Sequence, residues 1–102
     1  MRIVTKGRLA EFAAKHADAR SALESWHDQT VKADWSSLDD VRETYPAADA
    51  AKVKSGRDAT IFNIRGNRYR LIVAIHFNTQ VIYVMRFMTH AEYSKNTWKD
   101  SL

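Results

Sequence analysis

The fold is decided by the stretch from Ile61 to Val73, which reads IFNIRGNRYRLIV. Apolar and polar residues alternate on both sides of Gly66 and Asn67, a pattern typical of two β-strands joined by a tight turn. Like charges that face each other across a sheet are unfavourable, so an anionic partner would explain why three arginines lie so close together. The alternative is that each arginine covers apolar neighbours and keeps its charged end in water. The three residues are Arg65, Arg68 and Arg70.

The same alternation extends over three segments, which predicts a three-stranded antiparallel meander. The turn compositions RGN and NTQ separate these segments. A two-residue turn in the first hairpin would place Asn63 opposite Arg70. It would also place Arg65 opposite Arg68. The segments are ATIFNI from residue 59, RYRLIVAIHF from residue 68 and VIYVMRFM from residue 81.

The strand pleat assigns the side chains to two faces of the sheet. Tyr69, Leu71 and Val73 share one face, which we assign to the core, and Arg70 belongs to the other, open face. A three-residue loop at NTQ would place Arg86 on the face of Arg70, whereas a two-residue loop would not. We favour the longer loop, because it keeps the bulkiest aromatic residues of the two strands together.

The first half of the chain has helical periodicity. MRIVT can form a short first strand, and a first helix is predicted over residues 6–16. Asp18 is predicted to cap a second helix, and Pro46 is predicted to end a third. The segment AADAAKVKSGRD has no clear period and is predicted to be a mobile basic loop. Helices followed by strands predict an α+β fold with the helices packed on one face of the sheet.

Length and composition restrict the class of protein. The chain has 102 residues, 45% of them hydrophobic and 11% aromatic, which fits a single folded domain. It has no cysteine, which excludes a disulfide framework and a thiolate metal site. No apolar run approaches the roughly 20 residues that a membrane-spanning helix needs. The N-terminus becomes charged too early for a secretory signal, so we expect a cytoplasmic protein.

The charge is unevenly distributed along the chain. Residues 1–51 hold seven Lys or Arg against nine Asp or Glu, whereas residues 52–102 hold nine against three. The second half therefore has a net charge of +6, interleaved with aromatic residues. Such a segment is typical of a protein that binds a polyanion, and a merely basic, soluble surface is the alternative.

Two segments of the second half carry a family resemblance. FNIRGNRYRL and MRFMTHAEYSK resemble the HigB-type toxins of bacterial type II toxin–antitoxin systems, which belong to the RelE/ParE superfamily. The order of the predicted elements agrees with that family over nearly the whole chain. The resemblance implies a single RelE-like toxin domain over residues 1–102. It implies a short N-terminal strand, two to three helices, a three-stranded antiparallel meander and a short C-terminal helix.

The resemblance also implies an activity and a set of partners. Such toxins are metal-independent mRNA endoribonucleases that need no cofactor, commonly act at the ribosome, and inhibit translation and growth. A HigA-type helix-turn-helix antitoxin is expected to hold the toxin inactive and to repress the shared operon. The toxin would then contact operator DNA only indirectly, through the antitoxin, and no membrane partner is expected.

Residue by residue, the resemblance carries over to four catalytic candidates. Arg70 and Arg86 would stabilise the charge on the phosphate when the 2′-hydroxyl attacks it and the 5′-oxygen leaves. His90 is the side chain in these segments that suits proton transfer near neutral pH. Tyr93 could donate to the phosphate, stack on a base or simply pack under a short helix. The further RNA-binding candidates are Lys52, Lys54, Arg57, Arg65, Arg68 and Lys95.

No carboxylate in these segments is a convincing general base. The letters THAE have the form of a capping box, with Thr89 at the N-cap and Glu92 three residues later, so Glu92 is expected to be structural. His90 and Tyr93 would then share one helical face, because they are three residues apart. The remaining histidines show no metal-ligand spacing; they are His16, His27 and His76.

Two other functions are compatible with parts of this pattern. A toxin of the same fold that blocks a protein target without cutting RNA is the main alternative, but such relatives lack a His/Tyr pair after the last strand. A plain RNA-binding domain would need paired exposed aromatic residues on its central strands, which this sequence lacks. We therefore expect a toxin that cleaves mRNA.

Overall fold

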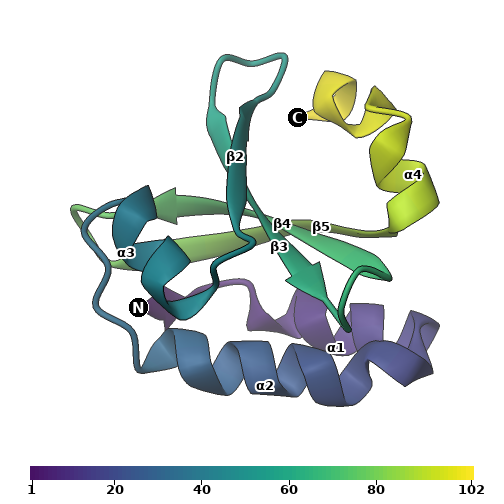
Figure 1. Ribbon diagram of the computed structural model, residues 1–102, viewed down its shortest axis with the longest axis horizontal. Coiled ribbons are helices and arrows are strands. Elements are labelled where there is room, and N and C mark those ends of the chain that lie inside the picture. Colours follow the sequence, from purple (N-terminus) through teal and green to yellow (C-terminus); the bar gives the residue numbers. More distant parts are fainter.

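Five strands form one sheet with helices on both sides of it (Figure 1). The computed structural model describes all 102 residues. None of the helices has the length and hydrophobicity needed to cross a membrane. The strands are β1 (Arg2–Ile3), β2 (Asp49–Lys52), β3 (Asp58–Ile64), β4 (Tyr69–His76) and β5 (Val81–Thr89). The helices are α1 (Lys6–Lys15), α2 (Arg20–Val31), α3 (Leu38–Thr44) and α4 (His90–Ser94), with 3₁₀ turns η1 (Ala17–Ala19) and η2 (Thr97–Ser101).

The strands lie in the order β1-β5-β4-β3-β2, and only the β1–β5 pair is parallel. The predicted α+β fold and the meander of β3, β4 and β5 are confirmed. The predicted mobile loop was wrong, because part of it forms β2, which pairs with β3 from Asp49 opposite Ile61 to Lys52 opposite Asp58. Alanine and aspartate have low strand propensity, so the pairing with β3, rather than the local sequence, makes this strand.

The β3–β4 hairpin has the predicted register. Asn63 lies opposite Arg70, and the N–H of Arg68 donates to the carbonyl oxygen of Arg65 at 3.3 Å across the turn. The backbone has positive φ angles at Arg65 (54°) and Gly66 (64°). Glycine adopts this conformation without strain, which explains its place in the turn.

A β-bulge, which the sequence pattern did not predict, interrupts the pairing of β4 with β5. Ile72 pairs with Arg86 and Val73 pairs with Val84, so Met85 is the extra residue. The predicted three-residue loop was wrong, because the paired strands end at residues 76 and 81. The bulge, and not the loop length, sets the alternation of the second half of β5.

The bulge determines which side chains of β5 face the helices. Ile82 and Val84 enter the core between the helices and the sheet, whereas Tyr83 lies on the opposite face and is 43% exposed. Beyond the bulge, Arg86 lies on the same face as Arg70, as predicted. Two arginines on adjacent strands are therefore presented by one face of the sheet.

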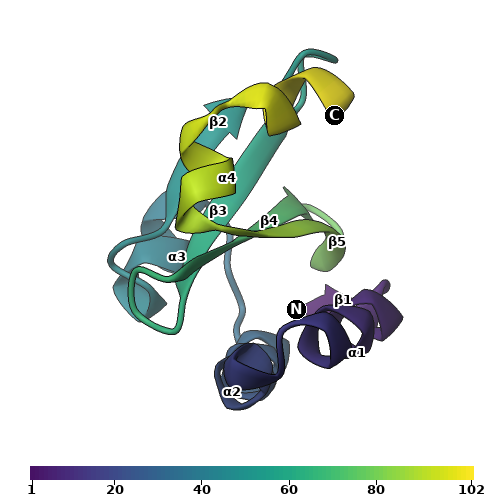
Figure 2. The same ribbon diagram turned by 90° about the vertical axis from the view of Figure 1, so that its right-hand side faces the viewer.

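Each face of the sheet has its own apolar core. Helices α1 and α2 lie against one face, and α4 with the C-terminal turn lies on the other side of β4 and β5 (Figure 2). Trp98 of η2 belongs to the second core, together with Ile72 and Met88. The prediction that the face of Arg70 is open was therefore wrong at this end of the sheet, and Arg70 is only 7% exposed. The residues after Ser94 have no periodic pattern that would reveal this return of the chain.

Asp18 connects the helices to the β3–β4 turn. Its carboxylate accepts hydrogen bonds from Arg65 at 2.6 Å, from Arg68 at 3.3 Å and from the hydroxyl of Tyr69 at 2.7 Å. The hydrogen bond from Tyr69 and the two guanidinium groups lower the pKa of Asp18 below its ordinary value of 3.8. The predicted N-cap role was wrong, since Ala19 occupies the N-cap position of α2 and no side chain caps that helix.

Replacing this carboxylate by an amide (Asp18→Asn) should lower the free energy of unfolding at neutral pH. The amide keeps an acceptor for Tyr69 but removes the charge that balances the two arginines. A carboxylate whose pKa is lowered on folding stabilises the folded state above its unfolded pKa, and this contribution is lost as the pH falls through the folded pKa. The stability difference between parent and variant should therefore shrink as the pH falls below 3.8.

Urea unfolding at a series of pH values measures this difference. Asp34→Asn is the matched control, because Asp34 is exposed and forms no ion pair. A difference for Asp18→Asn that is constant over the acidic range would contradict the assigned ion pairs.

Candidate active site

The end of β5 passes directly into the short helix α4, and a capping box holds this junction. The hydroxyl of Thr89 accepts from the N–H of Glu92 at 3.2 Å, and the carboxylate of Glu92 accepts from the N–H of Thr89 at 3.1 Å. This backbone hydrogen bond lowers the pKa of Glu92. The predicted capping box is confirmed, and the carboxylate of Glu92 is engaged in it. The N–H of His90 donates to the carbonyl oxygen of Arg68 at 3.0 Å, which fixes α4 against the hairpin.

Arg70 reaches from β4 to this helix and is held by neutral groups. Its Nη1 donates to the carbonyl oxygens of Asn67 at 3.1 Å and of Tyr69 at 3.2 Å. Its Nη2 donates to Oδ1 of Asn67 and lies 3.1 Å from Nδ1 of His90. Its Cζ lies 5.4 Å from the centre of the Tyr93 ring. No carboxylate pairs with this buried guanidinium, so its positive charge is solvated but not neutralised.

The contact with Arg70 determines where the neutral His90 ring carries its proton. A guanidinium can only donate hydrogen bonds, so Nδ1 of His90 must accept and the proton must be on Nε2. His90 is exposed, so a ligand can reach the ring. In this arrangement the ring presents an N–H donor together with a neighbouring positive charge.

Tyr93 is packed through its ring and free at its hydroxyl. Trp98 stacks on the ring with a centroid distance of 5.5 Å and an angle of 19° between the planes. The indole Nε1 of Trp98 also donates to the carbonyl oxygen of Tyr93 at 3.1 Å. The Tyr93 hydroxyl has no hydrogen-bond partner within the chain, and because the residue is only partly buried, a ligand can reach this side chain. The ring packs against Trp98 of the C-terminal turn, which agrees with the packing role that was one of the three predictions. Of the other two roles, the free hydroxyl favours donation to a ligand over stacking of the ring on a base.

Arg86 lies diagonally across the sheet from Arg70. Arg70 pairs with Met88, and Arg86 is two residues away from that partner, so the two backbones are about 7–8 Å apart. Nη1 of Arg86 donates to the carbonyl oxygen of Met85 at 3.0 Å, and its other N–H groups have no acceptor in the chain. The two arginines therefore lie on adjacent strands, on the same face of the sheet.

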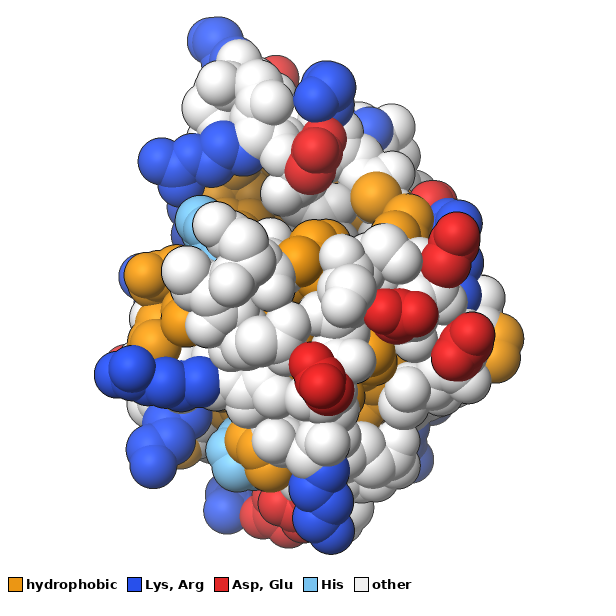
Figure 3. All heavy atoms as spheres, turned by 90° about the vertical axis from the view of Figure 1, so that its left-hand side faces the viewer, with side chains coloured by type: hydrophobic (Ala, Val, Ile, Leu, Met, Phe, Trp, Pro, Cys, Tyr) orange, Lys and Arg blue, Asp and Glu red, His pale blue; other side chains and the backbone are white.

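The six predicted RNA-binding residues differ in how much of their charge is balanced. Arg65 and Arg68 both pair with Asp18, so a carboxylate within the protein already balances their charge. Lys52 pairs with Asp58 at 3.0 Å, but both side chains are well exposed and such a pair is weak. On the face drawn in Figure 3, basic side chains dominate the left edge and acidic side chains lie toward the right. The exposed candidates without an ion pair are Lys54, Arg57 and Lys95.

Two residues that shape this site were missed by sequence reasoning. Asn67 was interpreted as a turn residue, but its backbone and side-chain oxygens both hold Arg70. Its position beside Gly66, three residues before Arg70, was the available signal. Trp98 supports Tyr93 from outside the recognised motif, and no local pattern indicated that contact.

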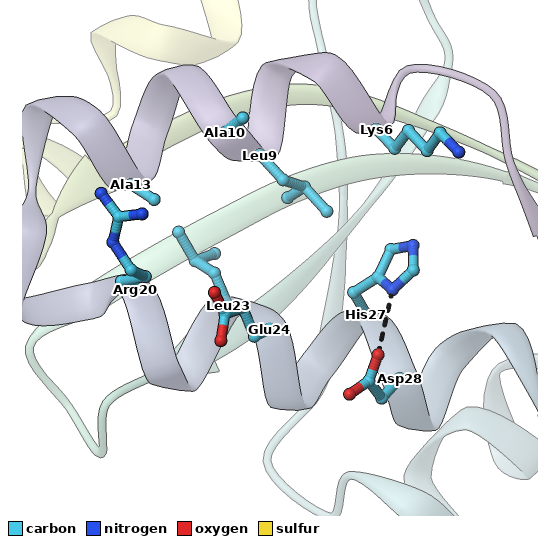
Figure 4. A pocket seen from close by; sticks show the side chains of 9 residues that line it. All are labelled: Lys6, Leu9, Ala10, Ala13, Arg20, Leu23, Glu24, His27 and Asp28. Carbon is cyan, nitrogen blue, oxygen red and sulfur yellow. Dashed lines mark hydrogen bonds and ion pairs between the residues drawn. The ribbon is translucent and has the colours of Figure 1, made fainter.

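A second hollow lies between α1 and α2, on the side of the sheet away from Arg70 (Figure 4). Its volume is about 420 Å³, and apolar side chains such as Leu9 and Leu23 alternate there with charges of both signs. His27 in this groove contacts Asp28 at 3.3 Å. The groove brings none of the catalytic candidates together. No three His, Asp or Glu side chains of the chain lie close enough to hold a metal ion.

Comparison with known proteins places this geometry in a family. The sequence model of the HigB toxin, described as a RelE-like toxic component of a toxin–antitoxin system, matches residues 19–96, which contain all four catalytic candidates. The chain is 29% identical over 97 residues to the mRNA interferase HigB of Escherichia coli O6:H1, covering 95% of this chain and 92% of that relative. It is 25% identical over 93 residues to the mRNA interferase toxin HigB of Escherichia coli K12 and to the mRNA interferase HigB of Shigella flexneri, covering 91% of this chain and 88% of each relative. The chain therefore belongs to the HigB family of RelE-like toxins from toxin–antitoxin systems.

Proposed function

We propose that this chain is the toxin of a type II toxin–antitoxin pair and acts as an mRNA endoribonuclease that needs no metal and works at the ribosome. One observation carries the proposal: Arg70 is an unpaired, buried guanidinium in contact with both His90 and Tyr93. Such a group binds an anion beside a side chain that can transfer a proton. The names of the relatives, mRNA interferases, support mRNA as the substrate.

RNA cleavage without a metal uses the 2′-hydroxyl of the substrate as the nucleophile. The hydroxyl oxygen attacks the adjacent phosphorus and passes its proton to water, while the bond to the 5′-oxygen breaks and that oxygen takes a proton from His90. Negative charge accumulates on the non-bridging oxygens, where Arg70 and Arg86 would stabilise it. The free hydroxyl of Tyr93 would donate a further hydrogen bond to the same oxygens.

The contact between Arg70 and His90 indicates how the substrate would prepare the site. A phosphate competes with Nδ1 of His90 for the N–H groups of Arg70, and hydrogen bonds to a charged acceptor are the stronger ones. When Arg70 turns to the phosphate, Nδ1 becomes free to take up a proton from water. The protonated ring of His90 can then donate a proton to the leaving 5′-oxygen.

A toxin of the same fold that blocks a protein target is the alternative function. Such a protein has no need for a proton-transfer group beside an unpaired arginine. The contacts of Arg70 with His90 and Tyr93 therefore favour the nuclease.

The family implies an antitoxin partner. We infer that this partner is a HigA-type helix-turn-helix protein, which would itself bind operator DNA, and that the toxin meets mRNA and the ribosome in the cytoplasm. The net charge of +6 in residues 52–102 supports acidic partners of this kind. Association through such charge is accelerated at low salt.

Induction of the chain in a bacterium should create new mRNA 5′ ends, and co-expression of the adjacent antitoxin gene should remove them.

His90→Gln should reduce cleavage by about 10²–10⁴-fold, the usual contribution of a general acid or base. Tyr93→Phe should also reduce cleavage, because the ring is packed and the hydroxyl is the free group. The RNA cleavage by the purified parent should persist in excess EDTA, with the magnesium that the ribosome itself needs controlled for.

His27→Gln, on the helical side of the molecule, is the matched control and should cleave like the parent. Full activity in both His90→Gln and Tyr93→Phe would show that these residues only cap and pack α4, and the non-cleaving toxin would then be the better account. Loss of activity in EDTA that a divalent ion restores would contradict the metal-independent mechanism.

Asn67→Ala tests whether the turn positions Arg70. The change removes one acceptor of the guanidinium without altering the charge of the site. A lost hydrogen bond to a charged group typically costs about 1.5–3 kcal/mol, so we expect the thermal unfolding temperature to fall. At a temperature where the variant is still folded, the less firmly held guanidinium should lower the cleavage rate by about 10-fold or more. Asn78→Ala, at an exposed residue of the β4–β5 loop, is the control. Parent-like cleavage by Asn67→Ala would show that Arg70 needs no such support.

A further inference from the structure

A groove on the Arg70 side of the sheet, separate from the hollow between α1 and α2, has no part in the proposed cleavage chemistry. Its volume is about 570 Å³, and it lies where the start of α1, the β2–β3 turn, the end of β4 and the first half of β5 meet. No Asp or Glu side chain lines it. The lining residues that matter here are Arg8, Arg57, Ala74, His76, Tyr83 and Met85.

Two arginines give the groove a positive charge that no carboxylate balances. Nη1 of Arg8 donates to the carbonyl oxygens of Val84 and Met85, each at 3.2 Å, which holds this guanidinium at the rim. Its remaining N–H groups have no acceptor in the chain. The side chain of Arg57 is exposed and makes no hydrogen bond or ion pair at all. Guanidinium groups of this kind bind phosphate well.

The groove also contains an exposed aromatic ring. Tyr83 is 43% exposed, and His76 supports it edge-on with a centroid distance of 5.2 Å and an angle of 76°. The bulge at Met85 is the reason for this exposure, because it sends the neighbours of Tyr83 into the core and Tyr83 to the opposite face. An exposed aromatic ring beside free cations is a typical platform for a base of single-stranded RNA.

The groove is continuous with the catalytic candidates along one face of β4. Ala74 lies on the same face as Arg70, four residues further along the strand, which corresponds to about 13 Å. Arg86 pairs with Ile72 and so lies between the two positions. A strand of RNA whose phosphate contacts Arg70 can therefore run past Arg86 into the groove.

We propose that this groove is a nucleotide-binding subsite, which holds the base and phosphate of a single-stranded RNA nucleotide a few positions from the cleaved bond. Tyr83 stacks on the base, and Arg57 and Arg8 bind the phosphate. The inference rests on the proposed nuclease function. It adds a site that determines where the RNA lies on the protein surface.

The test uses a fluorescently labelled single-stranded RNA oligonucleotide and the full chain with His90→Gln, which slows cleavage during the measurement. Adding Tyr83→Ala should weaken binding by about 10-fold, the usual loss when one stacked base loses its platform. Tyr83→Phe keeps the ring and should bind like the His90→Gln parent. Arg57→Ala should weaken binding and reduce the slope of log affinity against log salt by about 0.7, as expected for one lost phosphate contact. Arg20→Ala removes the same charge from the helical side and should do neither.

Three results would overturn the inference. Unchanged RNA affinity in Tyr83→Ala would exclude stacking of a base on this ring. Equal losses of RNA affinity in Arg20→Ala and Arg57→Ala would show that only the overall positive charge matters, and not the groove. If Tyr83→Ala and Arg57→Ala lost binding to the antitoxin but kept binding to RNA, the groove would belong to a protein partner. Cleavage by proteins with native His90 separates this inference from the proposed function. If the parent cleaves RNA and Tyr83→Ala keeps full RNA affinity, only the subsite is contradicted. If the parent does not cleave RNA and Tyr83→Ala binds RNA more weakly, only the nuclease function is contradicted.

Discussion

The burial of one unneutralised positive charge is the constraint on which the rest of this structure depends. Arg70 is 7% exposed and is surrounded by carbonyl oxygens, an amide oxygen, an imidazole nitrogen and an aromatic ring, but by no carboxylate. Removing a charge from water is costly unless hydrogen bonds replace the lost solvation. The turn and α4 supply these hydrogen bonds, and an anion would complete the site electrostatically.

The other two arginines of the hairpin have a different role from that of Arg70. Arg65 and Arg68 share Asp18, so the turn that carries the oxygens of Asn67 is fixed to the helical layer. The three arginines of the hairpin therefore differ in whether a carboxylate of the chain balances their charge. Two of them pair with a carboxylate of the chain, whereas the third has no ion pair within the chain and, in the proposed function, binds the phosphate of RNA.

How far this arrangement could be predicted depends on whether the interactions are local. The register that places Asn63 opposite Arg70, and the capping box of Thr89 and Glu92, follow from patterns within a few residues, and both are confirmed. The pairing of Asp18 with Arg65 spans 47 positions and has no local pattern. The same reason explains the missed strand β2 and the return of the C-terminal turn over the sheet, because tertiary packing overrides weak local preference there.

The bulge at Met85 shows how one such miss changes the surface beside the catalytic candidates. Strict alternation would have placed Tyr83 and Phe87 on one face, whereas the extra residue separates them. Phe87 stacks on Tyr69 at 5.0 Å in the core, and Tyr83 is left beside the basic groove. The bulge thus produces both a well-packed core and an exposed aromatic ring on the side of the catalytic candidates.

The central claim is that Arg70 and His90 promote attack by the 2′-hydroxyl of RNA on its own phosphate. Mass spectrometry of the cleavage products of a defined RNA tests it most directly. The account predicts a 2′,3′-cyclic phosphate on the upstream fragment and a 5′-hydroxyl on the downstream fragment, with no cleavage when the attacking nucleotide is 2′-deoxy. A 3′-hydroxyl with a 5′-phosphate, or cleavage of the 2′-deoxy substrate at the parent rate, would contradict it.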